Sequence, residues 1–85
     1  MANKYEILTA LYSIVRDKPQ PLACLVTTRE LLLRLKGDWQ PEYLEELVRE
    51  ELLVVLREST GVVMRLTEKG WEKARLKLAL RLPLL

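Results

Sequence analysis

The sequence predicts an α+β domain that contains four helical segments, a short strand and a two-stranded β-hairpin. Apolar residues recur at helical intervals in four segments, and two continuous apolar runs flank a turn-forming stretch. The 85 residues are 49% hydrophobic and 31% charged, which suits one globular domain over residues 1–85 and excludes a largely disordered chain. A chain this short buries only about 60% of its unfolded surface, so nearly every apolar segment must join one core.

The first helix is expected over residues 4–16, because Asn3 and Glu6 have capping-box spacing and apolar residues follow at helical intervals. These apolar positions are Ile7, Leu8, Leu11, Ile14 and Val15. The prolines within residues 17–21 end the helix, since proline disfavours helix at the residue before it. Residues 22–26 then form a short apolar run bounded by turn residues, which suits a brief strand.

The second and third helices are predicted by their caps. Thr27 forms a capping box with Glu30, and Gly37 suits a left-handed C-terminal cap. The buried face of the second helix is expected to hold Leu31, Leu32 and Leu35. A third helix covers residues 40–51, because Pro41 is favoured at the first helical position. Its buried face is expected to hold Tyr43, Leu44, Leu47 and Val48.

The rest of the chain predicts a hairpin and a last helix. Residues 52–57 and 62–66 are matching apolar runs on either side of a turn at residues 58–61, which indicates an antiparallel hairpin. Thr67 is expected to cap the last helix. The buried stripe of this helix is expected to hold Trp71, Ala74, Leu78 and Leu82.

The residue inventory excludes most catalytic chemistry. With no His and one Cys, the chain cannot form a Ser–His or Cys–His pair, a Cys/His zinc site or an internal disulfide. Cys24 lies in an apolar run and is expected to be a small buried hydrophobe. The carboxylates lie on solvent-facing helical ridges, so we expect no enzyme, no cofactor and no metal. We also expect a cytoplasmic protein, since no charge-free stretch is long enough to cross a membrane and no secretory signal opens the chain.

Two stretches resemble a known family. Residues 66–71, Leu-Thr-Glu-Lys-Gly-Trp, resemble the "L-T-x-x-G" junction between wing and last helix in small winged-helix regulators of the MarR-like and PadR-like kinds. Residues 41–53 are similar to the passage from the third helix to a leucine-rich strand in the same proteins. The resemblance implies a winged helix, with a three-helix core, a short strand, a two-stranded hairpin wing and a C-terminal helix.

The family resemblance also implies a function. Residues 27–36 would be the supporting helix of a helix-turn-helix, residues 40–51 the recognition helix, and the hairpin around residues 59–61 the wing. In such proteins the recognition helix enters the DNA major groove and the wing touches the backbone or minor groove. The resemblance therefore implies a DNA-binding transcriptional regulator. The positions that it places nearest to double-stranded DNA are Arg29, Gln40, Tyr43, Arg49, Arg57, Thr60 and Arg65.

The charge distribution leaves an alternative open. Residues 40–51 carry one basic and five acidic side chains, whereas residues 67–85 carry five basic and two acidic ones. An acidic helix opposes DNA docking, because affinity for DNA comes largely from neutralising phosphates. The alternative is a winged-helix protein–protein interaction module without DNA binding, in which Glu42 and Glu46 meet a basic protein partner. The same acidic residues also fit a solvated helix face.

The last helix carries leucines on its far side. By helical spacing, Leu76 and Leu80 lie opposite the buried stripe, so one copy of the chain cannot readily bury both sides. Either these leucines form a homodimer interface through the C-terminal helix, or the terminal residues and long basic side chains cover them. The basic residues of this helix recur four positions apart, which suits a phosphate-binding ridge or a solvated face. These residues are Lys69, Lys73, Lys77 and Arg81.

Overall fold

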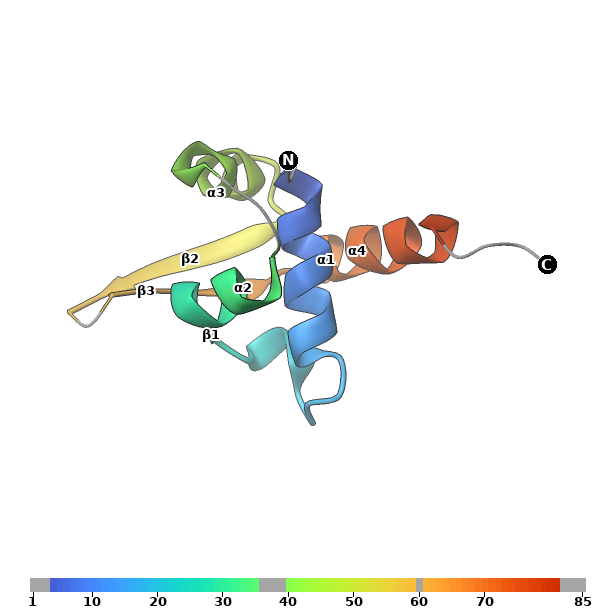
Figure 1. Cartoon of the computed structure of the whole chain (residues 1–85), viewed down its shortest axis with the longest axis horizontal. Coiled ribbons are helices and arrows are strands. Elements are labelled where there is room, and N and C mark those ends of the chain that lie inside the picture. The colour runs from blue at the N-terminus through green and yellow to red at the C-terminus, as the bar shows by residue number, and fades with distance from the viewer. Residues whose placement is uncertain (1–3, 36–39, 60, 82–85) are drawn as a thin grey trace.

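The computed structural model describes residues 4–35, 40–59 and 61–81. Within them the chain forms four α-helices, one turn of 3₁₀-helix and a three-stranded antiparallel sheet (Figure 1). The predicted α+β class is therefore confirmed. In chain order the elements are α1 (Lys4–Val15), η1 (Pro21–Ala23), β1 (Val26–Thr27), α2 (Thr28–Arg34), α3 (Pro41–Arg49), β2 (Leu53–Glu58), β3 (Gly61–Leu66) and α4 (Glu68–Arg81).

The hairpin and the last helix project in opposite directions. In Figure 1 the β2–β3 hairpin extends to one side of α1, and α4 runs to the other side. α2 and α3 lie on the hairpin side, whereas α4 packs against α1. The hairpin side and the α4 side therefore present separate surfaces.

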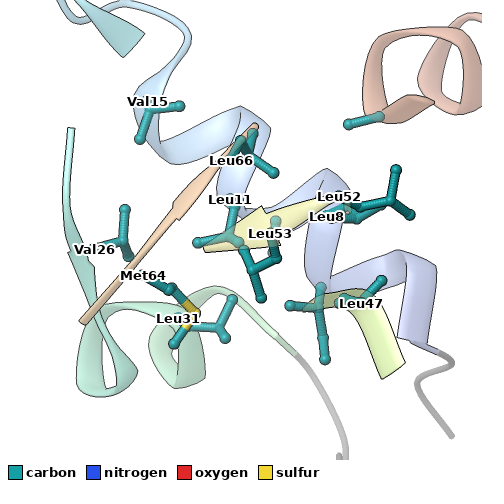
Figure 2. Packing of buried hydrophobic residues seen from close by; sticks show 13 residues of the cluster. Leu8, Leu11, Val15, Val26, Leu31, Leu47, Leu52, Leu53, Met64 and Leu66 are labelled. Carbon is teal, nitrogen blue, oxygen red and sulfur yellow. The ribbon is translucent and has the colours of Figure 1, made fainter. Parts of the chain in front are cut away.

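A hydrophobic core around α1 joins these elements (Figure 2). Among the described side chains, the fully buried large ones come from α1, α2, α3, all three strands and the turn between α3 and β2. They are Ile7, Leu8, Leu11, Val15, Val26, Leu31, Leu47, Leu52, Leu53, Met64 and Leu66. α4 contributes the buried Ala74. The predicted apolar stripe of the first helix is thus confirmed, with Ile14 half-buried at its edge. Three predicted features lie outside the described residues, namely Asn3, Gly37 and Leu82.

α2 begins at the predicted capping box. The Glu30 amide donates a hydrogen bond to Thr27 Oγ1 at 3.1 Å, and the Thr27 amide donates to Glu30 Oε1 at 3.3 Å. The helix is shorter than the expected 27–36, because Leu35 already has an extended backbone at the C-cap. A helix of only about two turns presents a single row of side chains to the core. Leu32, predicted to be buried, is for this reason exposed.

The strand predicted over residues 22–26 is confirmed only at its last residue, Val26. Pro21 instead begins a turn of 3₁₀-helix, and only Val26 and Thr27 pair with β3. The fixed φ of proline suits the first position of a helical turn, and a short apolar run does not distinguish a strand from a helical segment. Cys24 is half-buried and packs against the edge of the core, so its predicted apolar environment is confirmed in part.

α3 ends before the predicted boundary at residue 51, in a Schellman motif. The Leu52 amide donates to the Leu47 carbonyl and the Glu51 amide donates to the Val48 carbonyl, each at 3.0 Å. Glu51 has a φ of 64°, the left-handed conformation that glycine usually supplies. Leu47 and Leu52 are both buried at this reversal, so the chain turns directly from α3 toward β2.

Thr67 joins the end of α3 to the start of α4. Its Oγ1 accepts a hydrogen bond from the Gly70 amide at 2.9 Å and donates one to the Glu51 carbonyl at 2.7 Å. The Thr67 amide donates to the Leu52 carbonyl at 3.2 Å. A Cβ on Gly70 would lie 2.0 Å from the same carbonyl oxygen, so a side chain does not fit there. The predicted cap is confirmed, and the Leu-Thr-x-x-Gly spacing has a structural explanation.

The predicted hairpin is confirmed, and its register fixes the two faces of the sheet. β3 lies between β1 and β2. Directly paired residues of neighbouring strands lie on the same face of a sheet. The inner face, toward the core, carries the pairs Leu53–Leu66, Val55–Met64 and Arg57–Val62. The outer face carries the pairs Val54–Arg65, Leu56–Val63 and Glu58–Gly61.

Candidate functional site

A groove of about 560 Å³ lies between α3, the hairpin and the start of α2, and we name it the α3–hairpin groove. Its lining is mostly apolar, with an acid, a base and a hydroxyl among eight residues. They are Thr28, Pro41, Leu44, Glu45, Val48, Val55, Arg57 and Val62. The volume falls within the range of about 300–1,000 Å³ that is typical of ligand pockets. Because this volume is combined with a mostly apolar lining that contains few polar groups, the groove is the candidate binding site.

α3 supplies one wall of the groove. The wall residues follow the spacing i, i+3, i+4 and i+7, and they are Pro41, Leu44, Glu45 and Val48. Val48 is 42% exposed, so the prediction that it is buried is wrong. Leu47, one position earlier, is fully buried. Because successive helical residues are about 100° apart, Val48 is turned from the core toward the groove, whereas Leu44 lines the groove and also packs against the core.

The hairpin supplies the floor of the groove through its inner face. Val55 and Val62 pack against the hydrophobic core, so the apolar floor is continuous with the interior. The Thr28 hydroxyl donates to the Val62 carbonyl at 3.3 Å and holds the start of α2 beside the floor. Arg57 is exposed and supplies a cation near the tip of the hairpin.

The register separates the two arginines of the hairpin. Arg57 pairs with Val62 on the inner face, whereas Arg65 pairs with Val54 on the outer face. The two pairs are three positions apart, which is about 10 Å along the strands. Arg57 and Arg65 therefore do not form one cationic surface, although the sequence interpretation places both near the same DNA.

The exposed charge of α3 is acidic, but less so than the sequence suggests. Glu42, Glu45 and Arg49 are exposed, and Glu46 is half-buried. Of the two acids predicted to meet a protein partner, Glu42 is thus open to solvent and Glu46 is partly covered. Glu45 borders the groove directly. Glu45 is the acid of the groove lining, opposite the Arg57 cation of the hairpin, and Glu42 lies near Glu45 on the first turn of α3.

Glu50 turns away from the groove and toward α1. Its carboxylate accepts a hydrogen bond from the Tyr5 hydroxyl at 3.1 Å and forms an ion pair with Lys4 at 2.5 Å. The hydrogen bond with the Lys4 ammonium lowers the pKa of Glu50 below its ordinary value, and the same contact raises the pKa of Lys4. Glu50 therefore belongs to the packing of α3 on α1 and not to a binding surface.

Basic side chains of α4 gather at the same tyrosine. The Nζ atoms of Lys73 and Lys77 lie 4.5 and 5.7 Å from the centroid of the Tyr5 ring, and that of Lys4 lies 5.2 Å away. Cations at this distance from an aromatic ring are attracted by its quadrupole. Part of the basic ridge of α4 is thus held against α1, on the side of the molecule away from the groove.

The other positions that the resemblance assigns to DNA are dispersed. Arg29 is exposed on α2, and Gln40 is exposed at the N-cap of α3 without a side-chain capping bond. Tyr43 is half-buried and packs against the core. Thr60 lies outside the described residues. Of the seven positions, Arg57 alone is among the groove-lining residues of the described chain.

The two sides of α4 differ as the sequence predicts. Ala74 is buried, and the half-buried Trp71 packs on the ring of Tyr12 with centroids 4.5 Å apart. On the far side Leu76 is 55% exposed. The side chain of Leu80 lies outside the described part of the structure.

Sequence reasoning missed the apolar lining of the groove as a site. Leu44 and Val48 were expected in the core, and Val55 and Val62 were expected only as hairpin residues. The available signal was the second apolar row of α3, at Pro41, Leu44 and Val48, which lies beside the row that contains Leu47.

Other kinds of site receive no support from the described residues. Among residues 4–35, 40–59 and 61–81, no three His, Cys, Asp or Glu side chains are grouped so as to hold a metal ion. No helix in this part of the chain is long and apolar enough to cross a membrane. Comparisons with protein-family models, with characterised proteins and with solved structures gave no match. The chemistry of the groove is therefore the basis for assigning a function.

Proposed function

We propose that this protein is a winged-helix module that binds another protein, and that the α3–hairpin groove holds an apolar segment flanked by basic residues. The observation that carries the proposal is the open apolar surface formed by Leu44, Val48, Val55 and Val62. Apolar surface left open beside a polar rim is typical of protein-binding sites.

The winged-helix part of the proposal is supported by the order and pairing of the elements. The chain runs helix, short strand, two helices, hairpin and helix, and the short strand pairs with the hairpin. In this reading α3 is the recognition helix and the hairpin is the wing. The hydrogen bonds of Thr67 with Gly70 and Glu51 lie in residues 66–71, the stretch that resembles the family, and they join the end of the hairpin to the last helix.

Double-stranded DNA is the alternative ligand, which the family resemblance favours. A DNA site needs several cations on one surface, since most of the affinity comes from phosphate contacts. The exposed side of α3 instead offers Glu42, Glu45 and one cation, Arg49. Apolar side chains occupy the space between α3 and the hairpin, where a DNA backbone would have to approach. These features favour a protein over DNA.

The groove suits a partner segment with apolar anchors on one face. In helix-in-groove recognition, residues spaced i, i+3, i+4 and i+7 enter an apolar channel and supply most of the affinity. The Val48 side of the groove would receive these anchors. Glu45 would attract a basic residue next to the anchors, which contributes to specificity and association rate more than to affinity.

Fluorescence anisotropy with three labelled probes tests the proposal. The first probe is a peptide of Leu and Lys with leucines at i, i+3, i+4 and i+7, the second replaces each Lys by Glu, and the third is a random DNA duplex. We expect the Leu/Lys peptide to bind at least about tenfold more tightly than the Leu/Glu peptide. Salt-sensitive binding of DNA without binding of either peptide would overturn the proposal in favour of a DNA regulator.

A pair of matched variants locates the binding surface. Val48→Glu places a carboxylate in the apolar wall and should abolish binding of the Leu/Lys peptide. Leu56→Glu is the control, because Leu56 is similarly exposed, at 43%, but lies on the outer face of the sheet. We expect this control to bind as the wild type does, with circular dichroism confirming that both variants are folded. Equal losses in the two variants would contradict the assignment to the groove.

A further inference from the structure

The α3–hairpin groove carries charges of opposite sign on its two sides. Glu45 belongs to the α3 wall, whereas Arg57 belongs to β2 near the tip of the hairpin. Both side chains are exposed. Within residues 4–35, 40–59 and 61–81, neither of them forms an ion pair or a side-chain hydrogen bond. Each charge is therefore available to a molecule that enters the groove.

The charged neighbours keep the two sides of the groove distinct. Glu42 is exposed on the first turn of α3, so the α3 side is acidic. Arg49 is exposed on the same helix but is not among the lining residues. On the hairpin, the register places Glu58 and Arg65 on the outer face, and Arg57 is the only charged residue among the paired positions of the inner face. The hairpin side of the groove is therefore basic.

Apolar side chains make up most of the lining around these two charges. The lining row of α3 extends from Pro41 to Val48, which is about 10 Å along the helix axis. A partner helix that lies beside this row contacts it over about two turns, with its apolar stripe on the floor formed by Val55 and Val62. The residues that flank the stripe on one side then face α3, and those that flank it on the other side face the hairpin.

We propose that the partner segment is an amphipathic helix whose apolar stripe has a basic flank on one side and an acidic flank on the other. The inference rests on the proposed function, since it names the chemistry of the occupant of the same groove. The basic flank lies along α3 and meets Glu45, and the acidic flank lies along the hairpin and meets Arg57. A helix that is basic on both flanks binds less tightly, because it brings a cation to the Arg57 guanidinium.

The two charges of the groove also select the direction of the partner helix. Reversing the helix in the groove exchanges its flanks, which brings an acid to Glu45 and a base to Arg57. Charges that flank an apolar seam set orientation in the same way in coiled coils. Exposed ion pairs contribute modestly to affinity, so each pair is expected to change the dissociation constant only several-fold.

Fluorescence anisotropy on the full chain tests the assignment of the two flanks. The Leu/Lys peptide of the binding test is compared with a Leu/Lys/Glu peptide, which keeps the leucines and the lysines of one flank and carries Glu on the other flank. We expect the Leu/Lys/Glu peptide to bind the wild type about fivefold more tightly, because its acidic flank meets Arg57.

Reversing one charge of the groove should reverse this order of affinities. We expect Arg57→Glu to bind the Leu/Lys peptide about fivefold more tightly than the Leu/Lys/Glu peptide. Arg65→Glu is the matched control, since it makes the same change of charge on the outer face of the same hairpin, and it should keep the wild-type order. Each variant is compared on both peptides, so a difference in helicity between the peptides does not affect the reversal. Circular dichroism confirms that both variants are folded.

The α3 side of the groove is tested by a second pair of variants. Glu45→Lys places a cation on the α3 wall, so this variant should bind the Leu/Glu peptide about fivefold more tightly than the wild type does. Glu58→Lys makes the same change of charge on the outer face of the hairpin and should leave the affinity for this peptide unchanged.

Three results would overturn the inference. They are equal affinities of the wild type for the Leu/Lys and Leu/Lys/Glu peptides, an order of affinities that Arg57→Glu does not reverse, and a reversal that Arg65→Glu produces equally well. If the wild type binds both peptides with the same affinity, the acidic flank is wrong and the proposed function stands. If it binds neither peptide, the proposed function fails as well.

Discussion

Leu47 and Val48 are neighbours in α3, yet Leu47 is fully buried whereas Val48 is 42% exposed beside the α3–hairpin groove. The same contrast separates two regions of the molecule. Around α1, which packs against α2, α3 and α4, apolar side chains are covered and Glu50 is bonded to Tyr5 and Lys4. We call this the closed region. Between α3 and the hairpin, apolar side chains meet solvent, and we call this the open region.

The contrast indicates that the residues that stabilise the fold differ from those that line the groove. A buried leucine contributes roughly 1.5–3 kcal/mol through removal of its surface from water, and a half-exposed valine contributes less. The open region therefore adds little to the folded state, while it keeps apolar surface available for a partner. Substitutions in the two regions should have very different effects on the free energy of unfolding.

The largest effect is expected from Gly70→Ala in the closed region. A Cβ at this position would lie 2.0 Å from the Leu52 carbonyl oxygen, so α4 must move and the bonds of Thr67 must break. We expect a loss of at least about 3 kcal/mol in the free energy of unfolding, or failure to fold. Urea unfolding followed by circular dichroism measures this loss.

Gly61→Ala is the matched glycine control for this prediction. Nothing lies within 4 Å of a Cβ placed on Gly61, although its φ of 140° makes the substitution strained. We expect a loss of about 1 kcal/mol, from backbone strain alone. If Gly61→Ala costs as much as Gly70→Ala, the close contact with Leu52 is not what makes the junction rigid.

Thr67→Val should have the next largest effect. It removes the hydroxyl that caps α4 at Gly70 and donates to the Glu51 carbonyl. The loss of one cap and one further hydrogen bond should cost about 2 kcal/mol. Thr67→Ser keeps the hydroxyl and should stay within about 0.5 kcal/mol of the wild type in the same urea titration. A Ser variant as unstable as the Val variant would show that the methyl group and not the hydroxyl matters.

Glu51→Gly should raise the stability of the fold, in contrast to the destabilising substitutions at Gly70 and Thr67. Glu51 ends α3 with a φ of 64°, a conformation in which a side chain is unfavourable. We expect the free energy of unfolding to rise by about 0.5–1 kcal/mol. Glu51→Ala removes the same carboxylate without relieving the backbone, so it should give no gain in thermal or urea unfolding.

The ion pair of the closed region should make stability depend on pH in the acidic range. Its contact with Lys4 lowers the pKa of Glu50 in the folded state, so the folded protein favours the ionised carboxylate. The resulting stability is present above the ordinary glutamate pKa of 4.5, and it is lost as the pH falls through the lower folded pKa. As the pH is lowered from about 6 to about 3, the urea midpoint should therefore fall less steeply for Glu50→Gln than for the wild type. Glu58→Gln, an exposed carboxylate on β2, should keep the wild-type slope.

The smallest effect is expected in the open region. Val48→Ala should cost less than about 1 kcal/mol, because the side chain is already partly in water. Leu47→Ala, one residue away, should cost about 2–5 kcal/mol because it leaves a cavity in the core. Similar losses for the two variants in urea unfolding would mean that the groove is closed in solution and that the two regions are not distinct.

Much of the fold could be predicted from local signals. The capping box of Thr27 and Glu30, the cap at Thr67 and the apolar stripe of α1 each depend on residues close together in the sequence, and all three are confirmed. The strand predicted over residues 22–26 is wrong at every position except Val26, because an apolar run of this length fits a strand or a helical turn equally well, and here Pro21 begins a helical turn.

The groove could not be predicted in the same way. Helical periodicity identifies the apolar side of α3, but it does not show how much of that side the neighbouring strands cover. α3 contacts β2, yet Val48 remains 42% exposed beside the groove. The opposite faces of Arg57 and Arg65, by contrast, follow from the register once the turn is placed between Glu58 and Gly61.

The hydroxyl of Thr67 has a consequence for motion as well as for stability. The amides of Thr67, Gly70 and Trp71 all donate within the junction, and the amide of Leu52 closes the end of α3. We expect these four amides to exchange with deuterium as one protected set that opens only with global unfolding. We therefore expect α4 to fray only from its C-terminal end, while its first turn stays fixed to the end of α3.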